Sequence, residues 1–216
     1  MKSSATQIRT SVAKSYARAI HAAEEEKGSC CAPSCCGSSE DTSSADSALN
    51  ADVPSFGCGD PLLFSNVDEG ATVLDLGSGA GYDLIAAASR VGPEGHVIGV
   101  DMTDDMIAAA QRNVDAAGLA NVEIRKGIIE DLPVESSSVD WVISNCVINL
   151  SPNKQQVFRD ALRVLKPGGR LAISDVVAST EMPEDMKNDP LLHAGCMAGA
   201  SLVEDLEMMM KEAGFT

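Results

Sequence analysis

The chain has 216 residues, of which 44% are hydrophobic, and a formal net charge of −16. This length favours one catalytic-sized domain with a single core and an N-terminal appendage. The negative charge argues against nucleic acid and anionic membrane surfaces as partners, since both attract clustered Lys and Arg. A neutral or cationic small molecule agrees better with this charge, although a solvated acidic surface explains it too.

The chain shows no export signal and no stretch of the roughly 20 apolar residues that a membrane-spanning helix requires. We therefore expect a cytoplasmic protein. Its seven cysteines are then more typical of metal binding or redox work than of a disulfide framework.

The N-terminal part divides into a helix and a segment without periodicity. Four apolar side chains repeat at four-residue steps within residues 5–26: Ile8, Val12, Tyr16 and Ile20. This narrow stripe predicts a helix that docks on another element. Residues 28–55 are rich in Ser, Ala, Gly and acidic residues, which predicts a mobile segment. Its cysteines are Cys30, Cys31, Cys35 and Cys36. We expect the folded domain to begin near Phe56, so the division is 1–27, 28–55 and 56–216.

From residue 72 onwards, patterns of strands and helices alternate. The predicted strands are 72–76, 96–100, 122–125, 139–144 and 170–174, and the predicted helices are 82–91, 104–117, 154–165 and 202–213. Pro167 and Gly168 are natural stop residues for the third of these helices. The alternation predicts an α/β fold with a Rossmann-like, doubly wound, mostly parallel sheet. Residues 214–216 resemble the approach to another strand, so we expect a chain truncated at its C-terminal end.

A glycine-rich loop, Gly77–Gly81, follows the first predicted strand and opens a helix. Such a loop lets a ligand press against backbone N–H groups at the helix N-terminus. A dinucleotide fingerprint would place its third glycine at position 82, which is Tyr82. The spacing therefore argues against a nicotinamide cofactor.

The segment Val73–Gly81 resembles the first motif of class I S-adenosylmethionine-dependent methyltransferases. The resemblance implies that Asp75 lies near the amino acid part of the cofactor, and that Asp101 accepts hydrogen bonds from both ribose hydroxyls. As an alternative, Asp101 merely caps the helix that begins near Thr103. The cofactor-binding residues that we expect are Asp75, Gly77, Ser78, Gly79, Gly81, Asp101, Met102, Ile129, Glu130 and Asn145.

Three further cysteines stand in positions that favour function. Cys146 follows a predicted strand at the carboxyl edge, where open α/β sheets bind ligands. Cys58 stands between two glycines in the loop before the first predicted strand, and Cys196 lies in a Gly/Ala-rich loop. For any one of them alone, packing in the core is the better explanation, because a free cysteine behaves like a small hydrophobic residue.

The contexts of these cysteines resemble arsenite methyltransferases. The similar segments are Ser55–Pro61, Ser144–Pro152, Arg163–Gly169 and Gly195–Ala200. The resemblance implies that Cys146 and Cys196 are thiolates that hold trivalent arsenic as the substrate. It also implies that Cys58, with Cys30 or Cys31 as further candidates, supplies another thiolate or a redox partner. Soft thiolates are the ligands that trivalent arsenic prefers.

The implied reaction is methyl transfer from S-adenosylmethionine to thiol-bound arsenite, with an external thiol reductant such as thioredoxin or glutathione. Two alternatives stay open. A methyltransferase of quinone or sterol type shares the glycine loop but does not need Cys58, Cys146 and Cys196. A non-catalytic, thiol-rich fragment could bind metalloids through the N-terminal cysteines.

Overall fold

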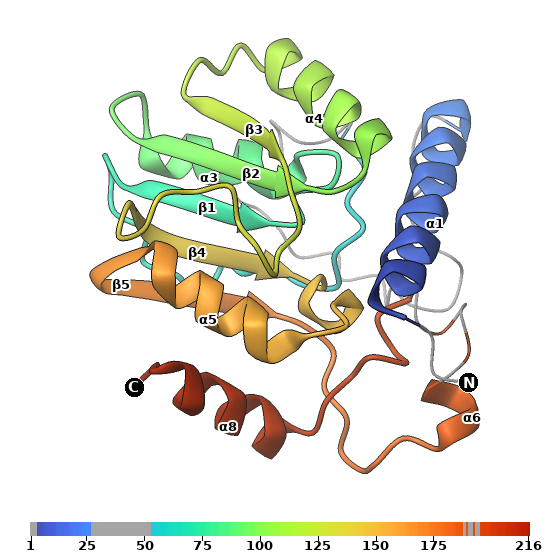
Figure 1. Cartoon of the computed structure of the whole chain (residues 1–216). Coiled ribbons are helices and arrows are strands. Elements are labelled where there is room, and N and C mark those ends of the chain that lie inside the picture. The colour runs from blue at the N-terminus through green and yellow to red at the C-terminus, as the bar shows by residue number, and fades with distance from the viewer. Residues whose placement is uncertain (1–3, 27–52, 188, 190–191, 193–194) are drawn as a thin grey trace.

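The computed structural model describes residues 4–26, 53–187, 189, 192 and 195–216 (Figure 1). The predicted mobile segment and its cysteines Cys30, Cys31, Cys35 and Cys36 lie outside these residues, apart from 53–55. Within the described part of the chain, no helix is both long and apolar enough to cross a membrane.

Five parallel strands form one sheet: β1 (Thr72–Leu76), β2 (His96–Asp101), β3 (Val122–Lys126), β4 (Val139–Asn145) and β5 (Leu165–Ser174). Their order in the sheet is β3-β2-β1-β4-β5, so the chain crosses over β2 and β1 between β3 and β4. This order confirms the predicted doubly wound fold. It also creates a switch point at the carboxyl ends of β1 and β4, where ligands bind in such sheets.

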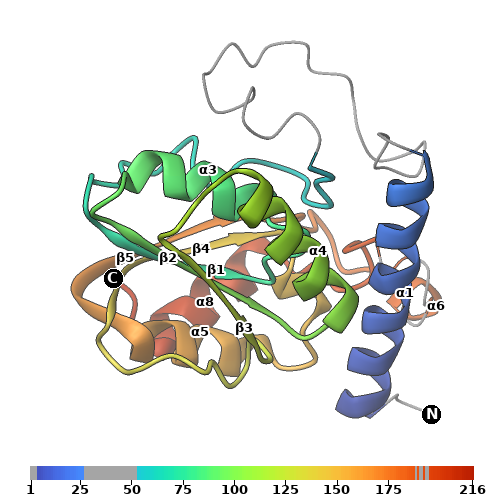
Figure 2. The ribbon, with the colours of Figure 1, turned by 90° about the horizontal axis from the view of Figure 1, so that it is seen from above.

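Helices cover both faces of the sheet and one end of it. They are α1 (Ala5–Glu26), α3 (Tyr82–Val91), α4 (Asp104–Ala116), the 3-10 helix η1 (Ile148–Leu150), α5 (Lys154–Val164), α6 (Glu184–Lys187) and α8 (Val203–Ala213). Figure 2 shows α3 and α4 on one face and α5 and α8 on the other. Alternate strand residues point to opposite faces, so Val73 packs in the core beneath α3 whereas Leu74 packs with Phe158 of α5.

Strand β5 begins earlier than the sequence analysis predicted. We expected a helix stop at Pro167 and Gly168 and a strand from Arg170, but β5 already starts at Leu165 and contains both stop residues. The register with β4 shifts between Val139 and Trp141. An edge position tolerates this arrangement, because a proline without an N–H removes no ladder hydrogen bond from an edge that is unpaired in the described chain.

Helix α1 lies across the carboxyl ends of the strands, toward which the arrowheads in Figure 1 point. The predicted apolar stripe docks there. Val12 is 4% exposed and packs with Cys146 and Cys196, and Ile20 is 2% exposed and packs with Met106 of α4. The N-terminal helix therefore covers the sheet edge that carries the candidate site.

Candidate active site

A pocket lies between the glycine loop, the carboxyl ends of β2 and β4, and helix α1. It measures roughly 870 Å³ including the part that opens to solvent. The predicted site residues that line it are Gly77, Ser78, Gly79, Asp101, Met102, Ile129, Glu130, Asn145 and Cys146. Asp75 and Gly81 do not line it: Asp75 is buried behind the loop, and Gly81 caps the N-terminus of α3. One pocket thus contacts most of the predicted cofactor residues together with one of the predicted thiolates.

Asp101 ties the glycine loop to the end of β2. Its Oδ2 accepts a hydrogen bond from the Gly79 N–H at 3.0 Å, and its Oδ1 accepts one from the Thr103 N–H at 2.8 Å. The alternative that Asp101 caps the helix is not supported, because Thr103 is the N-cap of α4 and Asp101 bonds the Thr103 N–H, not an N–H of the first turn. Since Asp101 also lines the pocket, the same carboxylate orders the loop and faces the ligand space.

Glu130 lines the pocket and is buried, and it forms an ion pair with Arg9 of α1. Ser151 donates a hydrogen bond to Glu130 Oε1 at 2.6 Å, and Arg9 Nη2 lies 3.3 Å from the same oxygen. Arg9 and Tyr16 of α1 line the pocket as well. The N-terminal helix therefore contributes side chains to the site in addition to covering it.

Three carboxyl groups crowd the glycine loop. Burial, and then the charges of Asp83 and Asp101, raise the pKa of Asp75 well above its ordinary value. Burial likewise raises the pKa of Asp83 to about 6 and the pKa of Asp101, although hydrogen bonds from Asn145 and from backbone N–H groups oppose these two shifts. Among the described residues, Asp75 Oδ2 has no hydrogen-bond partner. Such a cluster favours a cationic ligand, because a positive charge would relieve the repulsion.

The stability of the ligand-free chain should fall as the pH rises through about 6. Asp83 holds its proton in the folded state up to about pH 6, but in the unfolded state only up to about 3.8. Its stabilising contribution is thus complete below pH 3.8 and is lost above 6. Between pH 5 and 7.5, we expect a loss of about 1 kcal/mol through this group.

Denaturant unfolding at these two pH values, with Asp83→Asn as the comparison, measures this contribution. The asparagine keeps an acceptor for Asn145, whose Nδ2 donates to Asp83 at 3.1 Å. The variant should show the smaller pH dependence. An identical pH dependence in both chains would contradict the assignment.

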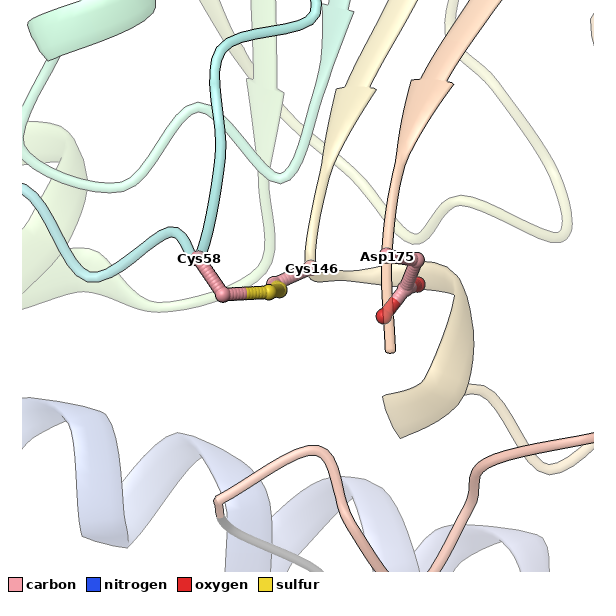
Figure 3. A group of neighbouring side chains, drawn as sticks. All are labelled: Cys58, Cys146 and Asp175. Atoms are coloured by element: carbon pink, nitrogen blue, oxygen red, sulfur yellow. A yellow bond between two sulfur atoms is a disulfide. The ribbon is translucent and has the colours of Figure 1, made fainter. Parts of the chain in front are cut away.

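Cys58 and Cys146 meet beside the pocket, and the structure joins them in a disulfide with Cα atoms 6.0 Å apart (Figure 3). A carboxylate oxygen of Asp175, just after β5, lies within 4.8 Å of both sulfurs. Cys196 is buried, and its thiol donates to the Cys146 carbonyl oxygen at 2.7 Å. The structure thus bonds Cys58 to Cys146 and places the Cys196 thiol against the backbone of Cys146. Among the described residues, the group of ligand atoms within 4.8 Å of one another contains Asp175 and not Cys196.

Cys146 and Cys196 both have left-handed backbone conformations, with φ of 56° and 61°. For residues other than glycine this conformation costs about 1–2 kcal/mol. Among the described residues other than glycine, only Ser137 shares it. Such strain persists where the surrounding structure over-determines it, and it clusters at functional sites.

Asn145 anchors the loop that carries Cys58. Its Oδ1 accepts hydrogen bonds from the Cys58 and Gly59 N–H groups, both at 3.2 Å, and its Nδ2 donates to the Gly59 carbonyl at 2.7 Å. Gly57 must be glycine here, because a Cβ would overlap the Asn145 side chain. We predicted Asn145 as a cofactor residue; it lines the pocket, and it also fixes Cys58 next to Cys146.

Residues 67–214 match the family model described as "Methyltransferase domain". The chain belongs to this family. A solved arsenic(III) S-adenosylmethionine methyltransferase from Chlamydomonas reinhardtii is 40% identical with a TM-score of 0.70; the match covers 79% of this chain and 62% of that one.

Two curated relatives differ in the reaction that their names give. An arsenite methyltransferase from Halobacterium salinarum is 58% identical over 160 residues, which cover 74% of this chain and 41% of the relative. A demethylmenaquinone methyltransferase from Listeria welshimeri is 39% identical over 114 residues, which cover 53% of this chain and 48% of the relative. The similarity to arsenite methyltransferases is confirmed, and the chain spans about half the length of the curated relatives that it matches.

The sequence analysis missed several polar residues at or beside the candidate site. Asp83 and Asp175 each carried a signal: Asp83 lies in the first turn after the glycine loop, and Asp175 directly follows a strand at the carboxyl edge, as Cys146 does. Tyr16 was predicted only as an apolar contact of the helix. Its hydroxyl lies 3.9 Å from Cys196 Sγ, and burial followed by the nearby Cys196 raises its pKa, so the phenol keeps its proton.

Proposed function

We propose that this chain transfers a methyl group from S-adenosylmethionine to trivalent arsenic held by Cys58, Cys146 and Cys196. The observation that carries the proposal is the meeting of three cysteines, distant in sequence, beside the pocket of a methyltransferase glycine loop. A methyl transfer to carbon or oxygen has no use for such a cluster. Relatives named arsenite methyltransferases support the same substrate.

The cofactor would lie in the pocket along the predicted residues, with the Asp75, Asp83 and Asp101 carboxyls nearby. S-adenosylmethionine supplies a methyl group on a positively charged sulfur. The orphaned Asp75 Oδ2 and the raised pKa values of the carboxyls agree with a cationic ligand. These carboxyls hold the charge in place, while Asp101 keeps the loop ordered through Gly79.

The thiols of the chain hold and orient the substrate. Soft thiolate sulfurs bind trivalent arsenic, whose remaining lone pair would attack the methyl carbon. The bond between the methyl carbon and the sulfonium sulfur would break, which leaves a neutral thioether and passes the positive charge to the arsenic. Rate enhancement then comes mainly from position, since the arsenic needs no general base. A cysteine thiol has a pKa of about 8.5, and the thiolate is the nucleophile, so arsenic binding becomes faster as the pH rises toward that value. The thiol protons leave as water with the hydroxyl groups of arsenite.

The disulfide between Cys58 and Cys146 leads us to propose an external thiol reductant. Two of the three sulfurs cannot bind arsenic while they are bonded to each other. A dithiol protein such as thioredoxin, or glutathione, would open this bond through thiol–disulfide exchange.

Three further predictions remain. Cys30 and Cys31 are candidates for a further thiolate. We also keep the division of the chain at residues 27 and 55, and the cytoplasmic location, as predictions.

The test is to incubate the reduced chain with arsenite, S-adenosylmethionine and excess thiol, and to separate the arsenic species by liquid chromatography with arsenic-specific detection. We expect methylated arsenic. A chain that binds S-adenosylmethionine and neither binds nor methylates arsenite would contradict the proposal. A quinone substrate is the second candidate, favoured by the relative that acts on demethylmenaquinone, and it is assayed in parallel.

A further inference from the structure

The turns that carry Cys146 and Cys196 are 50 residues apart in sequence, so tertiary contacts must hold them together. Each cysteine has a left-handed φ, so its side chain points where it does only because the surroundings hold the backbone. A ligand that binds both sulfurs at once needs their separation to be set before it arrives, since ordering them on binding costs affinity.

Lys154, the first residue of α5, joins the two turns. Its Nζ donates to Asn149 Oδ1 at 2.7 Å in the turn that follows Cys146. The same ammonium donates to the Gly199 carbonyl oxygen and to Ser201 Oγ, the latter at 2.6 Å, in the turn that follows Cys196. All three donors of the lysine are thus used, one on the first turn and two on the second.

Asn149 extends this connection to the third loop of the site. It is 1% exposed, and its Nδ2 donates to Asp175 Oδ1 at 2.7 Å and to the Val176 carbonyl at 2.6 Å. Asp175 is the carboxylate that lies beside the Cys58 and Cys146 sulfurs. The hydrogen bonds therefore run from the end of β5 through Asn149 and Lys154 to the Cys196 turn.

The two turns also touch directly through their backbones. A Cβ at Gly199 would overlap the carbonyl oxygen of Asn149. Burial lowers the pKa of Lys154 to about 8, with the nearby Asp175 and Cys196 opposing the shift. Replacing Lys154 thus leaves the Asn149, Gly199 and Ser201 oxygens without the cation that draws them together.

We infer that Lys154 is a positioning residue that sets the separation of the Cys146 and Cys196 sulfurs, so that both bind one trivalent arsenic atom. The inference rests on the proposed function and adds to it a residue that touches neither the arsenic nor the cofactor. Loss of Lys154 should therefore weaken ligands that need two thiols and leave reagents that need one thiol unaffected.

The experiment uses the reduced full chain in which every cysteine except Cys146 and Cys196 is serine. Phenylarsine oxide, a trivalent arsenical that bridges two thiols, is titrated against this chain with and without Lys154→Met. N-ethylmaleimide, which needs one thiol, measures the reactivity of each cysteine by mass spectrometry. Lys166→Met is the matched control, because Lys166 pairs with Asp140, which bonds the Thr72 N–H at the start of β1, away from the carboxyl edge.

We expect Lys154→Met to weaken phenylarsine oxide binding at least about 10-fold, because losing a residue that orients the ligands of a metal commonly has an effect of this size. Alkylation of the two cysteines should not slow, Lys166→Met should bind like the parent, and Lys154→Arg should recover part of the affinity. Equal binding by the parent and Lys154→Met would overturn the inference, and so would a parent chain that binds no phenylarsine oxide.

Ser201→Ala removes a single acceptor of Lys154, and it decides the question if Lys154→Met does not fold. We expect it to weaken phenylarsine oxide binding about 3-fold, whereas unchanged binding would overturn the inference. A different result would contradict the proposed function alone. In that case the two-cysteine chain binds phenylarsine oxide, but the chain with all its cysteines does not methylate arsenite.

Discussion

Cys146→Ser is expected to abolish arsenic methylation, with turnover at least about 100-fold below the parent chain. The reason is that an oxygen replaces a soft sulfur at the centre of the thiol cluster, and trivalent arsenic binds hydroxyl groups weakly under excess thiol. Losing a ligand should cost at least as much as losing an outer partner, for which 10- to 100-fold effects are usual. Methylated product and bound S-adenosylmethionine are measured on the same samples, and cofactor binding should stay unchanged.

Cys146→Gly separates this chemical effect from stability. Glycine adopts the left-handed φ of 56° without strain. Under reducing conditions, where parent and variant both lack the disulfide to Cys58, this relief offsets the packing lost with a side chain that is 4% exposed. The free energy of unfolding of the variant should then stay within about 1 kcal/mol of the reduced parent. We expect this variant to fold normally and to be as inactive as the serine variant. Normal turnover in either chain would instead favour the quinone type of methyltransferase.

Asp75→Asn is expected to change stability and cofactor binding in opposite directions. The Asp75 side chain is 1% exposed, and its raised pKa means that folding at neutral pH costs free energy, either to bury the charge or to bind a proton. At low pH, Asp75 is protonated in both the folded and the unfolded state, and this cost is absent. The cost grows as the pH rises above the ordinary pKa of the unfolded state, and stability is lost until the pH passes the raised pKa of the folded state. At pH 7.5 the ligand-free variant should therefore melt at a higher temperature than the parent.

The same variant should bind S-adenosylmethionine about 10-fold more weakly, which corresponds to about 1.4 kcal/mol, because one negative charge near the cationic ligand is gone. Calorimetric titration measures the affinity, and thermal unfolding without the cofactor measures the stability. Asp68→Asn, at an exposed carboxyl, should change neither. A more stable variant with unchanged affinity would show that the charge of Asp75 does not act on the cofactor.

Most secondary structure could be predicted because its signals are local. Alternating apolar runs and the glycine loop led to four of the five strands within about one residue of their observed bounds. Strand β5 was the exception. A Pro-Gly pair normally ends an element, but at the edge of the sheet the missing proline N–H has no partner in the described chain to lose.

The candidate site was predicted less completely, because its contacts join distant segments. Asp101 ends a strand and Cys146 directly follows one, so their place at the carboxyl edge could be inferred from the alternation alone. That Cys58 bonds to Cys146, that α1 supplies Arg9 and Tyr16, and that Lys154 joins two turns depend on how the loops pack. No spacing along the chain encodes these contacts.

The amino-acid sequence alone therefore establishes the parallel sheet, the glycine loop and the three cysteine contexts, since periodicity and turn chemistry act over a few residues. The tertiary structure alone decides which sulfurs meet, which carboxyls lie close enough to raise one another's pKa values, and which lysine holds the turns. These properties depend on distances across the carboxyl edge, and such distances arise only when α1, the strand ends and the Cys196 turn pack together.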